Sequence, residues 1–189
     1  MKLLDIAMYV SEKIPTSNVN IEKYVSTENM IQNNGGLTLA SSLPSSPTVN
    51  SFKKDDVLFS NIRPYFKKLW YAKYDGAVSS DVLVFRSIDP VKLNSLFLYY
   101  LLSSDKFIQY TVNSSIGTKM PRGDKFAIMN YEVCLPNIKQ QKAIMEVLKS
   151  LDDKIENLTK QNLVLESLIQ TFFKSINPNL VLKKESEKS

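Results

Sequence analysis

The residues best suited to chemistry lie in loops that mix cations with polar and aromatic side chains. The segment 53–68, KKDDVLFSNIRPYFKK, carries Arg63, Lys67 and Lys68 close to Tyr65. Arginine can hydrogen-bond to base edges and lysine neutralises phosphate, so this composition suits contact with a nucleic acid. Because such loops are also common on plain protein surfaces, the segment taken alone favours a solvated loop without a partner.

A second loop of the same kind follows about fifty residues later. The segment 114–125, SSIGTKMPRGDK, contains Lys119 and Arg122, and its two glycines permit a close approach of the backbone to a partner. Met120 could wedge against bases or against the backbone of a nucleic acid. Taken alone, this loop also favours a plain surface loop, and the formal net charge of +5 is compatible with a polyanionic partner without requiring one.

The remaining residues give little indication of a catalytic site. The chain has no histidine, which removes Ser/His/Asp and Cys/His catalysis and most zinc sites. The carboxylate pairs Asp55–Asp56 and Asp152–Asp153 lack a third ligand at a suggestive spacing. Cys134 lies in the apolar run YEVCLP, which predicts buried packing rather than a nucleophile. We therefore expect no enzyme, no metal and no cofactor.

The bulk composition indicates a folded, non-membrane protein. With 189 residues, 43% of them hydrophobic, the chain suits one domain plus an appendage. No apolar run approaches the length of about 18 residues that a bilayer span requires, and no signal peptide is visible. A lone cysteine fits a reducing compartment, so we expect a cytoplasmic protein.

Short strands and helices must position the two loops. The segment 41–50 reads as an exposed loop. Asp89 suits an N-cap and Pro90 the first helical position before an apolar helix, and a second short helix is predicted from Asp105 to about Asn113. Strands and helices do not alternate regularly, which favours an α+β fold. The predicted strands are 4–10, 56–60, 69–72, 82–86 and 131–135.

The segment 137–176 reads as one uninterrupted helix. Asn137 followed by Gln140 is a capping-box pattern, and Asn177–Pro178 predicts the end of the helix. Such a helix is about 60 Å long. Its side chains step by four and three in heptads, with Leu148, Ile155, Asn162 and Ile169 at a and Leu151, Leu158, Leu165 and Phe172 at d.

This a/d seam predicts helix–helix packing. A large apolar side chain left in water forgoes about 1.5–3 kcal/mol of burial, so the seam needs a partner surface. The alternative is that the helix folds back on its own domain. Asn162 at an a position weakens the seam but can fix its register. Further apolar residues outside the seam predict a second contact, either with the attached domain or with another subunit. They are Leu163, Val164, Leu168 and Phe173.

Several motifs in one order resemble a known family. The runs KDDVLFSNIRPYFKKLWYA, SSDVLVFR and GTKMPRGDKF precede a Leu-Pro and a Gln-rich helix start, LPNIKQQKAI. Their order and spacing are similar to those of the specificity subunits of type I restriction–modification systems. The resemblance covers nearly the whole chain, and it implies a target-recognition domain at 1–136 and a dimerisation and spacer helix at 137–176. The tail at 177–189 ends in a charged run and is expected to be disordered.

The resemblance also implies a function. Such subunits are not enzymes; they select the DNA sequence on which separate adenine-N6 methyltransferase (modification) and restriction subunits act. The usual member carries two recognition domains and two helices, whereas this chain has one of each. A homodimer, or pairing with a second half-subunit, would restore the full set and would bind two methyltransferase subunits through the second apolar contact. Parallel and antiparallel pairing of the helices both remain open.

Two other classes of function stay in view. A coiled-coil scaffold without DNA reading would keep the dimer but show no salt-sensitive DNA binding, and a metal-dependent nuclease would cleave DNA. For the DNA-reading hypothesis, the candidate contacts with double-stranded DNA come from the two loops and from the Ser-Ser pair before the strand at 82–86. They are Ser60, Asn61, Arg63, Tyr65, Lys67, Lys68, Ser79, Ser80, Thr118, Lys119, Met120 and Arg122.

Overall fold

The most apolar strands lie at the centre of the fold, where both of their faces are covered. The computed structural model, which describes residues 1–176, pairs β5 (Val57–Ser60) with β8 (Val82–Ser87). Phe59 of β5 packs in one core and Leu58 packs in another. Burial on both faces explains why these strands are continuously apolar rather than alternating.

This pair belongs to the first of two four-stranded sheets. The first has the order β1-β8-β5-β6 with antiparallel pairing throughout, and the second has the order β2-β4-β7-β3, in which only β3 and β7 are parallel. The other strands are β1 (Ala7–Tyr9), β2 (Lys13–Pro15), β3 (Tyr24–Val25), β4 (Thr48–Phe52), β6 (Leu69–Tyr71) and β7 (Gly76–Val78).

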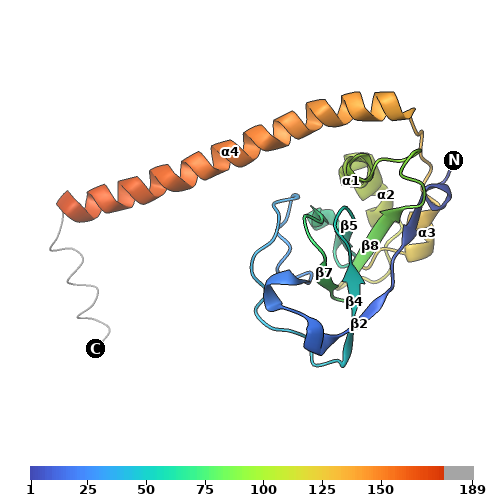
Figure 1. Ribbon diagram of the computed structural model, residues 1–189, viewed down its shortest axis with the longest axis horizontal. Coiled ribbons are helices and arrows are strands. Elements are labelled where there is room, and N and C mark those ends of the chain that lie inside the picture. Colours follow the sequence, from blue (N-terminus) through green and yellow to red (C-terminus); the bar gives the residue numbers. More distant parts are fainter. Residues whose placement is uncertain (177–189) are drawn as a thin grey trace. The chain divides into compact units, whose positions relative to one another are not determined.

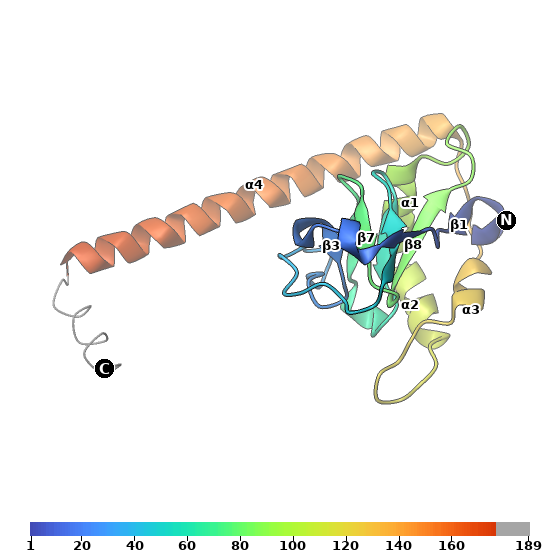
Figure 2. The ribbon, with the colours of Figure 1, turned by 60° about the horizontal axis from the view of Figure 1, so that its bottom comes forward.

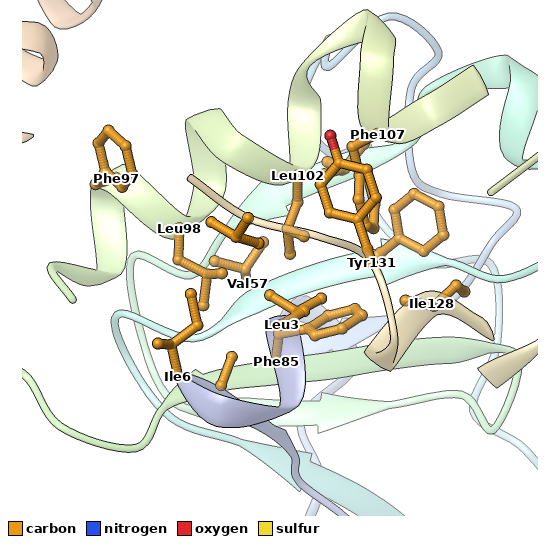
Figure 3. Packing of buried hydrophobic residues seen from close by; sticks show 14 of the residues in the cluster. Leu3, Ile6, Val57, Phe85, Phe97, Leu98, Leu102, Phe107, Ile128 and Tyr131 are labelled. Atoms are coloured by element: carbon orange, nitrogen blue, oxygen red, sulfur yellow. The ribbon is translucent and has the colours of Figure 1, made fainter. Parts of the chain in front are cut away.

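Helices cover the first sheet on the side away from the second sheet (Figure 1). They are α1 (Ser95–Ser103), α2 (Asp105–Asn113) and α3 (Lys125–Met129). Figure 3 shows their side chains packed on the sheet, with Leu98, Phe107 and Ile128 fully or almost fully buried against Val57 and Phe85. The layers are therefore helices, first sheet and second sheet, and the α+β prediction is confirmed.

A buried ion pair ties β8 to the start of β5. The guanidinium of Arg86 donates to both carboxylate oxygens of Asp56, from Nε and Nη2, at 2.7 Å each. The Asp56 side chain is only 2% exposed. The hydrogen bonds to Asp56 raise the pKa of Arg86 above its ordinary value, so the arginine stays charged.

The long helix α4 (Ile138–Ile176) begins with the predicted capping box. The Gln140 backbone N–H donates to Asn137 Oδ1 at 3.0 Å, and the Asn137 N–H donates to Gln140 Oε1 at 3.1 Å. Gln141 is fully buried, and its amide donates to the carbonyls of Lys92 and Pro136. The first turns of α4 thus belong to the compact unit 1–145, and the helix from Glu146 onward forms a second unit.

Two of the predicted strands are wrong in extent. In the segment 4–10 only Ala7–Tyr9 is a strand, because Leu3–Asp5 forms a 3-10 helix. The segment 131–135 is extended but makes only an isolated bridge, between Lys2 and Glu132. Its side chains alternate, so Tyr131 and Val133 are buried while Cys134 is exposed. The prediction that Cys134 is buried was therefore also wrong.

The predicted helix start at Asp89 and Pro90 was wrong as well. The segment 89–93 forms a turn, and the N-cap is Asn94, whose Oδ1 accepts from Leu96 N–H at 2.8 Å. The Lys92 carbonyl accepts from the Gln141 side chain, and the Leu93 carbonyl accepts from the Ser87 hydroxyl. A helix that began at Asp89 would need these two carbonyls for its own hydrogen bonds. The second predicted helix, Asp105–Asn113, is confirmed.

The other predicted strands agree with the structure, whereas the predicted loop 41–50 agrees only in part. The strands predicted at 56–60, 69–72 and 82–86 are confirmed within a residue of their bounds. The last residues of the predicted loop 41–50 belong to strand β4, which begins at Thr48. The predicted tail from Asn177 lies outside the described residues. Among the described residues, no helix combines the length and apolar character needed to cross a membrane. Short 3-10 helices also occur at Leu3–Asp5, Thr16–Asn18, Ile21–Lys23 and Pro64–Phe66.

Candidate nucleic-acid interface

The first basic loop is a tight turn held by its own backbone. It contains a single 3-10 turn, Pro64–Phe66, between two residues in the left-handed region, Arg63 (φ 50°) and Lys67 (φ 50°). Phe66 N–H donates to the Arg63 carbonyl and Lys67 N–H to the Pro64 carbonyl, both at 3.0 Å. A left-handed conformation is unfavourable for residues other than glycine, and it often marks functional loops.

The second basic loop lies against the first. Ile116 and Arg122 exchange backbone hydrogen bonds of 2.8 and 2.9 Å, and Gly117 (φ +97°) supplies the positive φ that this turn requires. Arg122 also forms an isolated bridge with Ile62, and Arg63 N–H donates to the Pro121 carbonyl at 2.8 Å. Figure 2 shows this loop extending beyond α2 and α3. The two loops predicted to bind DNA therefore form one structure.

A third segment, the Ser79–Asp81 turn before β8, joins them. Asn61 N–H donates to the Asp81 carbonyl at 2.8 Å, and the Asp81 carboxylate pairs with Arg122 Nη2 at 3.1 Å. The predicted Ser79 is half-buried there and Ser80 is exposed. The turn thus brings the Ser-Ser pair next to both basic loops.

A fourth segment was missed in the sequence. Asn33 (φ 55°) and Asn34 (φ 58°) form the centre of a type I′ turn, and their N–H groups donate to the carbonyls of Phe66 and Lys67 at 3.0 and 2.9 Å. Lys68 Nζ donates to the Thr27 carbonyl at 2.6 Å in the same region. The run Asn-Asn-Gly-Gly at 33–36 was the available signal, since type I′ turns favour Asn and Gly.

The predicted contact residues divide by exposure. Ser60 and Asn61 are buried, and Ser60 Oγ donates to the Ile62 carbonyl, so both hold the loop in place. A Cβ on Gly123 would lie 2.8 Å from Asn61 Oδ1, which shows how closely the loops pack at Asn61. The exposed residues on these loops, here called the recognition face, are Arg63, Tyr65, Ser80, Thr118, Lys119, Met120 and Arg122.

The cations of this region differ in what holds them. Lys67 pairs with Asp105, and Lys68 is held by the Thr27 carbonyl. Arg122 pairs with Asp81, although its side chain remains 56% exposed. Arg63 is exposed and has no ion pair with any residue in the described part of the chain. Lys119 is likewise exposed and forms no ion pair with a described residue, so Arg63 and Lys119 are the cations most available to a partner.

A polar hollow borders the recognition face. It has a volume of about 400 Å³, and Ser79 and Asp81 form part of its wall together with Thr27. Most of its other lining side chains are hydroxyls or amides, such as Ser26 and Asn29. The surface beside the cations is thus rich in groups that can both donate and accept hydrogen bonds.

The carboxylate pairs have structural partners instead of a metal-binding arrangement. Asp56 is held by Arg86, and Asp55 Oδ1 accepts from the Tyr71 hydroxyl at 2.9 Å. Burial and this hydrogen bond to Asp55 raise the pKa of Tyr71, so its hydroxyl remains a donor. Within residues 1–176, no group of three His, Cys, Asp or Glu side chains is placed to hold a metal ion.

The second predicted site lies on α4. Along the helix from Glu146, the apolar a and d side chains are exposed in the single chain, from 47% at Leu158 to 67% at Phe172, except for the half-buried Leu148. The second apolar set is equally exposed, with Leu168 at 60%. Exposed apolar side chains at such regular spacing are typical of an interface.

The ion pairs of the helix lie away from this seam. Lys149 pairs with Asp153 at 2.6 Å, and Lys160 pairs with Glu156 at 2.7 Å. In the heptad register all four residues occupy b or f positions, opposite the a and d side chains. The pairs therefore stabilise the helix without obstructing the seam.

Comparison with known proteins gives one consistent family. A family described as "Type I restriction modification DNA specificity domain" matches residues 1–167. The HindI type I restriction enzyme specificity subunit of Haemophilus influenzae is 30% identical over 131 residues, 66% of this chain and 28% of that protein. The MjaIX specificity subunit of Methanocaldococcus jannaschii is 34% identical over 92 residues, 48% of this chain and 21% of that protein.

Solved structures share the fold. The HsdS subunit from Thermoanaerobacter tengcongensis matches with a TM-score of 0.65 at 20% identity, over 84% of this chain and 43% of that one. The S subunit from M. genitalium matches with a TM-score of 0.59 at 18% identity, over 85% of this chain and 40% of that one. This chain spans less than half the length of each of these relatives. By its match over residues 1–167, the chain belongs to the family of type I restriction modification DNA specificity domains.

Proposed function

We propose that this chain reads one half of a bipartite DNA target and does not itself catalyse a reaction. The observation that carries the proposal is the junction at Arg122, whose backbone pairs with both Ile62 and Ile116 and so unites the two basic loops in one surface. Cations for phosphate and donors for base edges lie together on it. The relatives are named specificity subunits, in agreement with this role.

We propose further that two copies, or this chain and a second half-subunit, pair through the a/d seam of α4. Two reading domains would then lie at a spacing set by the helices. A twofold dimer would prefer an interrupted palindrome, since the symmetry of the protein is mirrored in the site. The exposed seam and the placement of the ion pairs at b and f support this pairing.

The second apolar set on α4, Leu163, Val164, Leu168 and Phe173, is proposed to dock methyltransferase subunits, two per dimer, with a restriction subunit joining the same complex. These side chains are about 60% exposed and lie outside the a and d positions. A helix that is apolar on most sides is buried on most sides. Pairing through the seam alone would leave this set in water.

Replacing Arg63 with alanine tests the DNA-reading role. We expect a loss of about 1–3 kcal/mol in binding to the preferred duplex, because an arginine on a base edge contributes that much. The measurement is a titration of labelled duplex at several salt concentrations. The control is Lys73→Ala, an exposed lysine between β6 and β7 that carries the same charge. Equal losses for both variants, or DNA binding by neither variant nor the parent chain, would contradict the proposal.

Replacing Leu168 with glutamate tests the docking role. We expect the variant to lose co-purification with the methyltransferase subunit while it still self-associates, because position g borders the seam without forming its centre. The measurement is affinity capture with quantified methyltransferase. The control is Ser150→Glu, which adds the same charge at an exposed position of the same helix, more than a heptad before the second apolar set. Undiminished capture by the Leu168 variant would remove the docking proposal.

A further inference from the structure

Asp81 lies beside the recognition face, in a position that charge alone does not explain. Its carboxylate lies beside Arg122 on a surface that is proposed to meet DNA, and a carboxylate repels phosphate. Its carbonyl accepts from Asn61 N–H at 2.8 Å, and its Oδ1 lies 3.1 Å from Arg122 Nη2. The side chain of Asp81 is 34% exposed and that of Arg122 is 56% exposed. The pair therefore stands at the surface, at the junction of three segments.

A single ion pair of this kind restricts the orientation of an arginine side chain and leaves most of its N–H donors free. A guanidinium has five N–H donors in a fixed planar fork, and Asp81 forms an ion pair with it at Nη2. The others remain available for acceptors, such as the O6 and N7 atoms of guanine. The backbone of Arg122 is itself fixed by its bridges to Ile62 and Ile116. Backbone and guanidinium are thus both held before any partner arrives, which lowers the entropy lost on binding.

We propose that Asp81 is a positioning residue, which aims the Arg122 guanidinium and so determines how strictly one base pair of the target is read. This inference rests on the proposed DNA-reading function. Asp81 acts through Arg122 and does not contact the DNA. Its removal should therefore relax sequence discrimination while it strengthens attraction to DNA of any sequence, because one negative charge leaves the interface.

The test uses the full chain with its methyltransferase partner and a pool of duplexes of randomised sequence. Bound duplexes are sequenced, and the preference at each base position is compared among the parent chain, Asp81→Asn and Asp81→Glu. For Asp81→Asn we expect about a tenfold loss of preference at one base position of the half-site, and weaker preference nowhere else. Total binding to unselected duplex should rise. Asp81→Glu, which can still pair, should restore the preference in part.

Two controls distinguish a loss of Arg122 positioning from a change in net charge and from a loss of folding. Glu132→Gln removes one exposed negative charge at the Lys2 bridge, away from the three segments, and should leave every base preference unchanged. Thermal unfolding shows whether each variant is folded. Should Asp81→Asn fail to fold, Arg122→Lys serves instead, because a lysine keeps the charge but lacks the planar fork, and it should lose preference at the same base.

The possible results test the positioning role of Asp81 separately from the proposed DNA-reading function. A parent chain without any sequence preference would remove the proposed function itself. A parent chain with a preference that Asp81→Asn retains would remove only the positioning role. If Asp81→Asn still changed the preference in an Arg122→Ala background, Asp81 would act on DNA directly, and the positioning role would again be overturned.

Discussion

Replacing Leu158 with glutamate is expected to convert an associating chain into a monomer. Leu158 is a d residue near the middle of the seam, and it is 47% exposed in the single chain. In a symmetric dimer the change removes two leucines from the interface and places two carboxylates there. Each leucine contributes about 1.5–3 kcal/mol of burial, so the dissociation constant should rise at least about a hundredfold.

Sedimentation equilibrium of the purified chain measures this effect. Ser167→Glu is the matched control, because it adds the same charge on the same helix at an f position, away from the seam. We expect the control to associate as the parent chain does. Identical behaviour of the two glutamate variants, or a parent chain that stays monomeric when concentrated with its methyltransferase, would contradict pairing through the seam.

Replacing Asp56 with asparagine should destabilise the compact unit 1–145 by about 3 kcal/mol or more. The change leaves the Arg86 guanidinium, whose side chain is 23% exposed, without its main anion. Removing one partner of a buried ion pair is costly because the other charge stays desolvated. Asp56 also accepts from Lys53 N–H at 2.7 Å, so the variant disturbs the turn that leads into β5.

Thermal denaturation should show a decrease in midpoint of about 10 °C for this variant. Asp55→Asn is the control, since the neighbouring residue is exposed and asparagine tolerates its left-handed backbone (φ 72°). A midpoint for Asp56→Asn within a degree or two of that control would show that the Arg86–Asp56 pair contributes little.

The sequence predicted best those elements whose signals are local. The capping box at Asn137 and Gln140 and the helix from Asp105 depend on neighbours along the chain, and both were predicted correctly. The helix start at Asp89 was mistaken because Gln141, some fifty residues away, takes the Lys92 carbonyl. Distant partners of this kind leave no trace in a local pattern.

The candidate site shows the same limit. Charge and residue type selected the two basic loops, but they could not show that Ser60 and Asn61 are buried between them. The Asn-Asn-Gly-Gly run could have indicated a turn at Asn33–Asn34. Its contact with Phe66 could not be predicted, because that contact is made by backbone groups, which any sequence supplies. Asp81 was overlooked because an acidic residue is not an obvious part of a DNA-binding surface.

Methylome sequencing of cells that carry this chain with its methyltransferase tests the central proposal most directly. Two identical reading domains joined by paired helices should yield one methylated-adenine motif with two specific halves, related by inverted symmetry and separated by a fixed unspecified gap. Loss of the motif in cells with the Arg63→Ala variant would link it to the recognition face. A genome in which this chain produces no methylated motif, or a motif with a single uninterrupted half, would contradict the proposal.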